Sequence, residues 1–250
     1  MKRSLILISI LSGLAGAVLR LWMLVGGTDA DGLPVSGHIS LYCIVLLILA
    51  ALVLFTLFSR RSPAPIQPLP AVSVPFAVIA IIGGVLVLFS VIAEYAGASR
   101  SVWQTSLLIL GLLGGFSLVL TGCLRAVGSS RLPGIRLLTL VYLLLKLIVN
   151  FKAWSVDPII PDYCFRLFAM IFILLAVYST AGLLFDSFHP KRSLFFCCTA
   201  VFFCMIAATD GILSHSLQGV AGTLFYSGFT LWLLAVLSYI LGRSPVPDRA

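Results

Sequence analysis

The sequence predicts an all-α fold, that of a polytopic integral membrane protein with eight transmembrane helices. Of its 250 residues 61% are hydrophobic and only 10% are charged, whereas a soluble domain carries about 25% charged residues. The apolar residues also come in blocks of about 20, the length with which a helix crosses a ~30 Å hydrocarbon layer. Because these blocks fill most of the chain, we expect a single transmembrane domain over residues 1–250.

The apolar blocks follow one another with short polar connections. In order they are Ser4–Val25, Ile39–Phe58, Val74–Ala93, Ser106–Leu124, Ile135–Trp154, Tyr163–Phe185, Leu194–Thr209 and Gly219–Leu241. Seven is the alternative count, because the block after Lys191-Arg192 is short and the first block imitates a signal peptide with a cleavage site at 15–17. The apolar run continues past that site to Val25, so we expect an uncleaved first helix.

Basic residues gather in alternate connections, which the positive-inside rule places in the cytoplasm. They are Lys2/Arg3, Arg60/Arg61, Arg125/Arg131/Arg136, Lys191/Arg192 and Arg243/Arg249. The aromatic residues Tyr95, Trp103, Trp154 and Tyr163 fall at the opposite helix ends, as an interfacial belt does. We expect a multi-pass protein with both termini in the cytoplasm. In topology and composition alone it resembles eight-helix proteins of the bacterial inner (plasma) membrane.

Two four-helix halves, residues 1–126 and 134–243, share a pattern of charges. Arg20 precedes Asp31 by 11 residues, and Lys146 precedes Asp157 by 11. The pattern is compatible with two parallel repeats related by an axis along the membrane normal. Apolar helices also resemble one another by chance, so the sequence leaves the duplication open.

Lys146 lies near the centre of the fifth block, LVYLLLKLIVNFKAW. A lysine at that depth costs about 2.5–3.5 kcal/mol on insertion scales, so we expect it to face the other helices. Tyr142 and Asn150 lie on the same helical stripe. There they can hydrogen-bond the ammonium or line water beside it.

Two acids end outward-running helices, Glu94 directly after the third block and Asp210 directly after the seventh. The helix dipole disfavours an anion there by several tenths of a kcal/mol, so each acid favours a cationic partner. Arg20 in the first block and Arg166 in the sixth are two further basic residues within the blocks. We therefore predict a polar pocket, open to the outside and walled by the first, third, fifth, sixth and seventh helices.

The sequence does not decide which cation pairs with which acid. Charges that only fix the helix register are the alternative to a binding pocket. The candidate ligand-binding residues are Lys146, Arg20, Tyr142, Asn150, Arg166, Glu94, Asp157 and Asp210.

Motifs for catalysis and cofactors are missing from the sequence. HExxH, GxSxG, Walker and GxGxxG patterns do not occur, and the six cysteines form no CxxC. His38 and His215 with Asp210 are a weak alternative for a metal or acid–base site. We expect no catalytic residue, metal or cofactor. The net charge of +8 marks topology rather than a nucleic-acid partner.

Three functions remain in order of preference. The first is a permease-like or ligand-binding membrane protein whose outward pocket takes a small anionic or zwitterionic ligand, such as a lipid headgroup. The second is an accessory or scaffold protein that binds a membrane-protein partner through its small-residue helix faces and its proline-rich loop after Arg61. The third is a membrane-embedded lipid-modifying enzyme, for which no residue spacing matches a catalytic template. In each case the lipid bilayer is a partner.

Overall fold

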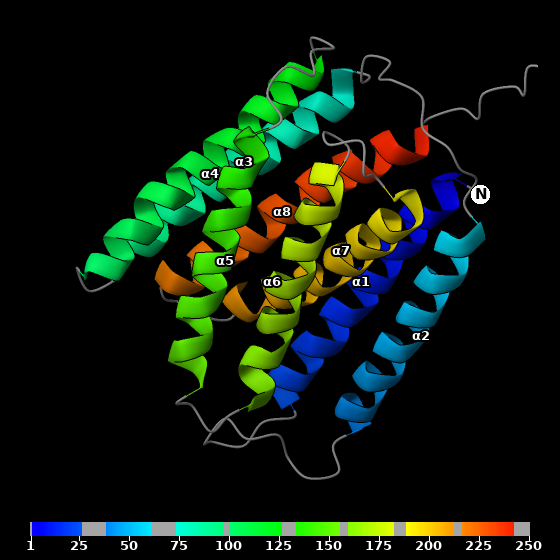
Figure 1. Cartoon of the computed structure of the whole chain (residues 1–250). Coiled ribbons are helices and arrows are strands. Elements are labelled where there is room, and N and C mark those ends of the chain that lie inside the picture. Colours follow the sequence, from blue (N-terminus) through cyan, green and yellow to red (C-terminus); the bar gives the residue numbers. More distant parts are fainter. Residues whose placement is uncertain are drawn as a thin grey trace, which may run out of the picture.

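A computed structural model describes residues 2–26, 39–61, 74–97, 101–126, 134–155, 160–182, 189–212 and 217–242. This part of the chain forms eight helices and no strand (Figure 1). They are α1 (Lys2–Gly26), α2 (Ile39–Arg61), α3 (Val74–Ala96), α4 (Val102–Ala126), α5 (Ile135–Trp154), α6 (Ile160–Ala181), α7 (Pro190–Ile212) and α8 (Leu217–Gly242).

Every one of these helices is long and apolar enough to cross a bilayer, with candidate spans of 19 to 25 residues. The seventh, which the short block 194–209 left in doubt, runs from Pro190 to Ile212 and qualifies as a span of 23 residues. The prediction of an all-helical, multi-pass membrane protein with eight spans is therefore confirmed for the described residues.

Several helices extend beyond their apolar blocks, because a helix keeps its hydrogen bonds where its residues turn polar. The fourth begins at Val102 rather than at Ser106. A capping box explains the earlier start, because the Ser101 hydroxyl accepts a hydrogen bond from the Gln104 backbone N–H while the Gln104 side chain accepts one from the Ser101 N–H.

The helices α7 and α8 form the centre of the bundle. In α7 72% of the span is buried by other helices, against 17% in the peripheral α2. The pair α1–α2 packs on α7, whereas α3 packs on α8 and α4 packs on α3. Helices α5 and α6 cross in front of this layer and close the molecule between α4 and α7 (Figure 1).

Glycines let the central helices approach one another closely. A Cβ atom on Gly83 of α3 would lie 2.6 Å from the carbonyl oxygen of Gly228 on α8. One on Gly84 would lie 2.8 Å from a methyl carbon of Val119 on α4. Only glycine fits at these crossings, as is common where membrane helices pack tightly.

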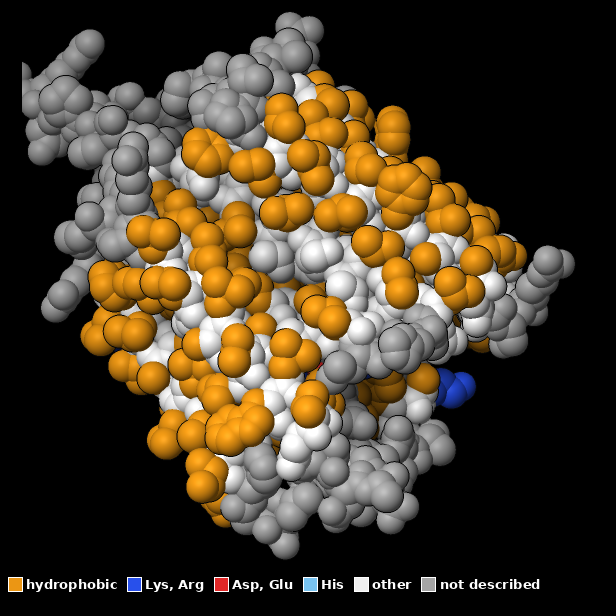
Figure 2. Space-filling model, turned by 180° about the vertical axis from the view of Figure 1, so that it is seen from behind, with side chains coloured by type: hydrophobic (Ala, Val, Ile, Leu, Met, Phe, Trp, Pro, Cys, Tyr) orange, Lys and Arg blue, Asp and Glu red, His pale blue; other side chains and the backbone are white. Residues whose placement is uncertain are grey.

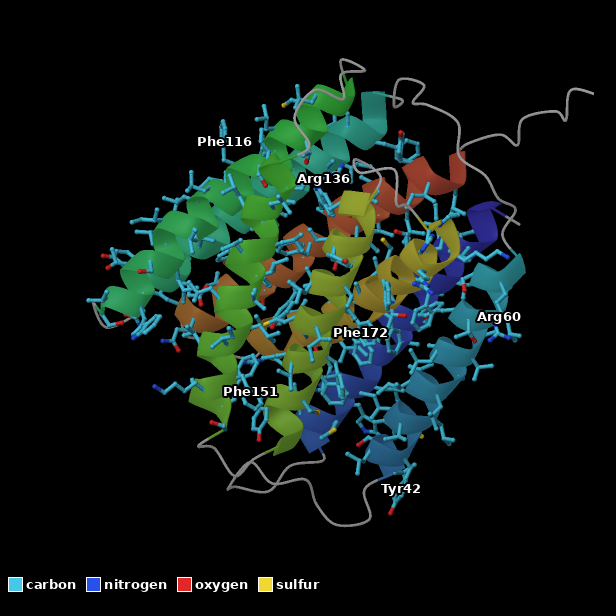
Figure 3. All side chains as sticks on the ribbon, viewed as in Figure 1. Tyr42, Arg60, Phe116, Arg136, Phe151 and Phe172 are labelled. Carbon is cyan, nitrogen blue, oxygen red and sulfur yellow. The ribbon has the colours of Figure 1, made fainter. Side chains whose placement is uncertain are left out.

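The outer surface is apolar, as contact with lipid requires. The face opposite that of Figure 1 is covered by hydrophobic side chains (Figure 2). Phe116 on α4, Phe151 on α5 and Tyr42 on α2 point away from the bundle, whereas Phe172 on α6 packs inward (Figure 3).

Arg136 differs from Arg60, Lys191 and Arg192, the other basic residues of the expected loops whose side chains the structure describes, because those three are exposed. It lies in the first turn of α5, it is buried, and its Nη1 donates a 2.9 Å hydrogen bond to the carbonyl oxygen of Thr180 on α6. This contact ties α5 to α6 at the end of the bundle opposite Trp154. The duplication of residues 1–126 in 134–243, which the sequence leaves open, is not tested by the contacts between helices.

Candidate binding cavity

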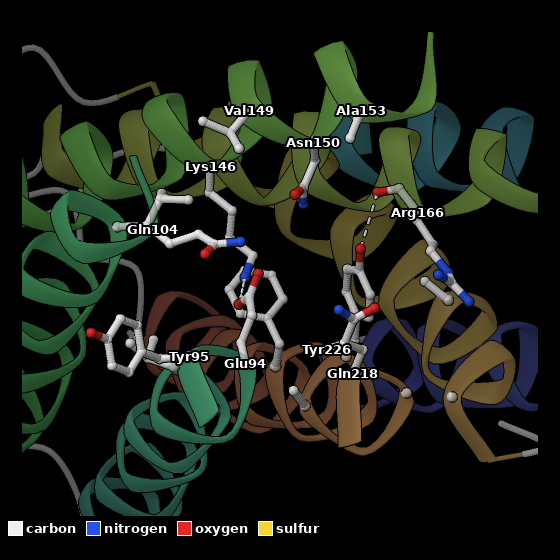
Figure 4. A pocket seen from close by; sticks show the side chains of 18 of the residues that line it. Glu94, Tyr95, Gln104, Lys146, Val149, Asn150, Ala153, Arg166, Gln218 and Tyr226 are labelled. Atoms are coloured by element: carbon white, nitrogen blue, oxygen red, sulfur yellow. Dashed lines mark hydrogen bonds and ion pairs between the residues drawn. The ribbon is translucent and has the colours of Figure 1, made fainter. Parts of the chain in front are cut away.

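A cavity of about 340 Å³ lies where α3, α5 and α7 end and α4, α6 and α8 begin (Figure 4). Tyr142 and Trp154 both line it, twelve residues apart on α5. At 1.5 Å per residue they are separated by about 18 Å along the helix. The cavity therefore reaches about halfway into a ~30 Å hydrocarbon layer.

The cavity exists because α5 packs on its neighbours α4 and α6 while α8 presents glycines across from it. A Cβ atom on Gly222 of α8 would meet nothing within 4 Å. One on Gly211 of α7 would instead collide with the carbonyl oxygen of Gly219 on α8. Glycine thus leaves space at the first position and permits the close α7–α8 contact at the second.

Lys146 faces the inside of the bundle, as the sequence predicts, and is only 6% exposed. Its ammonium forms an ion pair with Glu94 on α3. The Nζ atom also lies 4.5 Å from the ring centroid of Phe225 on α8 and 5.8 Å from that of Tyr142. The carboxylate and the two aromatic faces offset the cost of removing the ammonium from water.

The polar stripe of α5 is held in place by α4. Thr139 donates a 3.0 Å hydrogen bond to the carbonyl oxygen of Gly114, and its hydroxyl also pairs with that of Ser117. A Cβ atom on Gly111 would lie 2.9 Å from the ring of Tyr142. The absence of a side chain at Gly111 therefore makes room for the tyrosine ring beside Lys146.

The hydroxyl of Tyr142 is buried, and no residue that the structure describes meets the distance and angle of a hydrogen bond to it. Burying a hydroxyl without a partner costs about 1–3 kcal/mol. Tyr142 lines the cavity, so a polar group inside the cavity would remove this cost.

A second charged cluster lies on the α6 side. The Nε atoms of Arg20 on α1 and Arg166 on α6 lie 2.8 and 3.1 Å from the two carboxylate oxygens of Asp210 on α7. The guanidinium of Arg20 also lies 4.9 Å from the ring centroid of Phe165. Two guanidinium groups therefore share one carboxylate, which is 3% exposed.

Five of the predicted site residues line the cavity, namely Lys146, Tyr142, Asn150, Arg166 and Glu94. Arg20 and Asp210 do not; they lie behind Arg166, and Arg20 is only 1% exposed. Asp157 lies outside the described residues, as do Asp31, His38 and His215. The structure brings the described charges together, but whether they bind a ligand stays a prediction.

The predicted set of walls is corrected in two places. The first helix does not line the cavity, because its arginine is sequestered by Asp210. Helices α4 and α8 do line it, through Gln104, Leu107 and Leu108 and through a series from Gln218 to Tyr226. Both helices have the hydropathy of ordinary spans, and neither span contains a charged residue. A prediction of the cavity walls from charged residues therefore did not include them.

The sequence analysis did not identify the polar groups that α4 and α8 contribute to the cavity, which are Gln104, Gln218 and Tyr226. Gln218, Gly222 and Tyr226 recur every four residues on α8 and form one stripe. The hydroxyl of Tyr226 lies 3.5 Å from the carbonyl oxygen of Arg166, so it reaches from α8 to α6 (Figure 4). This stripe of polar and small residues was the signal that could have revealed α8 as a wall.

The cavity offers polar and apolar contacts together. Arg166 and the amides of Asn150, Gln104 and Gln218 supply hydrogen-bond donors, and the apolar lining comes mainly from Leu107, Leu108, Val149 and Phe225. No three potential metal-ligating side chains gather within the described ranges. Such a lining suits an amphipathic small molecule or a headgroup.

The fold and the cavity define a multi-pass membrane protein with a charged cavity at one end of its helix bundle. Comparison with known protein families, curated proteins and solved structures finds no match. A functional conclusion therefore depends on the chemistry of the cavity.

Proposed function

We propose that the protein is a permease-like or ligand-binding membrane protein whose cavity takes a small anionic or zwitterionic ligand. The observation that carries this proposal is a cavity of about 340 Å³ that holds Lys146, Glu94 and Arg166 in its wall. Charged groups at this depth are costly and usually functional in membrane proteins. Ligand sites typically combine a mostly apolar lining with a few polar groups, as this cavity does.

The proposal includes a location. With the basic residues inside, both termini lie in the cytoplasm of a bacterial cell and the cavity opens on the outer side of its plasma membrane. The exposed Lys191 and Arg192 at the start of α7, at the end of the bundle opposite the cavity, support this orientation.

The alternatives have weaker support. A scaffold would need free small-residue faces, but Gly13, Gly16, Gly111 and Gly115 all face other helices of the same chain. The proline-rich segment at 62–73 lies outside the described residues.

For a lipid-modifying enzyme, the acids Glu94 and Asp210 are both engaged by cations, which makes them poor proton carriers.

Cysteine accessibility tests whether the cavity is wet and open to the outside. Asn150 lines the cavity and is half-buried, whereas Ile148 lies nearby on α5 and is 56% exposed on the lipid-facing surface. In a variant without the six native cysteines, a membrane-impermeant maleimide added to intact cells should modify Asn150→Cys rapidly and Ile148→Cys slowly, because a thiol reacts only where water reaches it.

Thr139→Cys is the second control. It lies on the same stripe but is buried against α4, so we expect it to stay unmodified. Protection of Asn150→Cys from the external reagent, at normal expression and insertion, would contradict an outward-open cavity and remove the main support for the proposed function.

A further inference from the structure

The Glu94 end of the cavity already holds a cation. A carboxylate beside aromatic faces is the arrangement that recognises an ammonium group. Here the ammonium of Lys146 pairs with Glu94 and lies over Phe225 and near Tyr142. A ligand ammonium would have to displace a side chain of the same chain, so this end disfavours the cationic half of a zwitterion.

The Arg166 end has unused donors. A guanidinium carries five N–H donors in a planar fork. Arg166 uses its Nε atom on one oxygen of Asp210, whose other oxygen binds Arg20. The terminal nitrogens of Arg166 make no hydrogen bond to any residue of the described segments. The side chain is 36% exposed, and Arg166 is one of the residues that line the cavity. A carboxylate or phosphate fits such a fork.

The apolar lining lies toward the other end. Leu107 and Leu108 belong to α4, and α4 and α6 contact opposite sides of α5. Gln104 on α4 and Arg166 on α6 accordingly lie at opposite ends of the close-up (Figure 4). The cavity thus runs from an end where the Lys146–Glu94 pair lies beside apolar side chains such as Phe225 to an end at Arg166, with the amide of Asn150 between them.

We propose that Arg166 is the anion-binding residue of this cavity, and that the ligand is a monoanion in which one carboxylate or phosphate is attached to an apolar body. Lys146 is then a structural cation that fills the acidic end. The inference rests on the proposed function and narrows its ligand class. The shared chemistry covers a free amphiphilic acid and an anionic phospholipid.

Trp154 lines the cavity and provides the readout. The protein is placed in phosphatidylcholine nanodiscs and titrated with ω-bromooctanoate, because bromine quenches a nearby indole. Quenching of Trp154 is obtained as the part of the total quenching that is lost in a Trp154→Phe variant. ω-Bromooctylammonium is the matched cationic probe, and nanodiscs with bromine-labelled phosphatidylglycerol form the lipid arm.

We expect saturable quenching by the carboxylate and none by the ammonium. Arg166→Gln should weaken carboxylate binding at least about tenfold, because it removes a charge-assisted pair. Lys152→Gln removes the same charge from an exposed position outside the cavity and should change the affinity less than about twofold. Saturation in the lipid arm alone would identify a phospholipid as the source of the anion.

Other outcomes separate the two proposals. Gly222→Phe places a ring in the open space of the cavity and should abolish binding of any cavity ligand. Suppose that Gly222→Phe abolishes binding. If the ammonium probe then binds the unmodified protein as well as the carboxylate does, the assignment of Arg166 is wrong but the binding function stands. The same conclusion follows if Arg166→Gln leaves the affinity for the carboxylate unchanged. If neither probe nor the lipid gives saturable quenching, both proposals fail. In the Arg166→Gln variant Asp210 still has Arg20 as its cationic partner. Arg166→Lys is a second variant, which conserves the charge.

Discussion

Lys146 on α5 and Glu94 on α3 form an ion pair across the cavity, although the main packing partners of α5 are α4 and α6. The pair therefore joins two helices that do not pack directly on each other. The lysine is 6% exposed, while the glutamate side chain is 37% exposed. The ammonium of Lys146 is thus buried, whereas the carboxylate of Glu94 is partly exposed.

This asymmetry predicts the result of a double-mutant cycle. Removing one partner of a fully buried pair costs about 3–5 kcal/mol, and the partial exposure of Glu94 should reduce the cost of Lys146→Met to about 1–3 kcal/mol. Lys146→Met/Glu94→Gln should recover most of that loss, because no charge is left without its partner. Unfolding in mixed micelles measures the free energy. A loss in the double variant equal to the sum of the two single losses would show that the two residues do not interact.

The two arginines that bind Asp210 should differ in their contribution to stability. Arg20 is fully buried and contacts Phe165, whereas Arg166 is partly exposed to the cavity. Arg20→Gln should lower the unfolding free energy by about 2–4 kcal/mol, through a lost charged hydrogen bond and lost packing. Arg166→Gln should cost about 1 kcal/mol. Thermal unfolding of both variants tests this order, and a larger loss in Arg166→Gln would contradict it.

Asp210→Asn provides the matched control for this cluster. It removes the carboxylate that both guanidinium groups bind, so it should be at least as destabilising as Arg20→Gln. A stable Asp210→Asn variant would show that the cluster is held together by other contacts.

The same substitution at two glycines on facing helices should change the stability of the protein in opposite directions. Gly222→Ala adds a methyl group in open space and improves helix propensity, so it should stabilise the protein by up to about 1 kcal/mol. Gly211→Ala drives a methyl group into the carbonyl oxygen of Gly219 and should destabilise it by about 1–3 kcal/mol. Melting temperatures give the comparison, and destabilisation by Gly222→Ala would mean that the cavity is filled.

The spans and the inward direction of Lys146 were predictable because they follow from the thickness of a bilayer and the cost of placing charge in it. The polar stripe of α5 was predictable for a similar reason, since helical periodicity puts Tyr142, Lys146 and Asn150 on one face. These are local properties, and each can be read from one segment of the chain.

The partners of the charges were not predictable. Arg20 and Asp210 are 190 residues apart and meet only because α1 packs on α7. Likewise, α8 was expected to be an ordinary span and instead supplies much of the cavity wall. Helix packing decides both results, and apolar helices carry few sequence signals that specify their neighbours.

By itself the sequence predicted an all-helical, multi-pass membrane protein whose central lysine faces inward, because hydrocarbon imposes the same requirements on every segment. Only the tertiary structure decided that Lys146 binds Glu94, that two arginines share Asp210, and that a cavity separates the two clusters. Those results depend on which glycines permit close approach and which leave space, and that depends on side-chain packing between helices far apart in the chain.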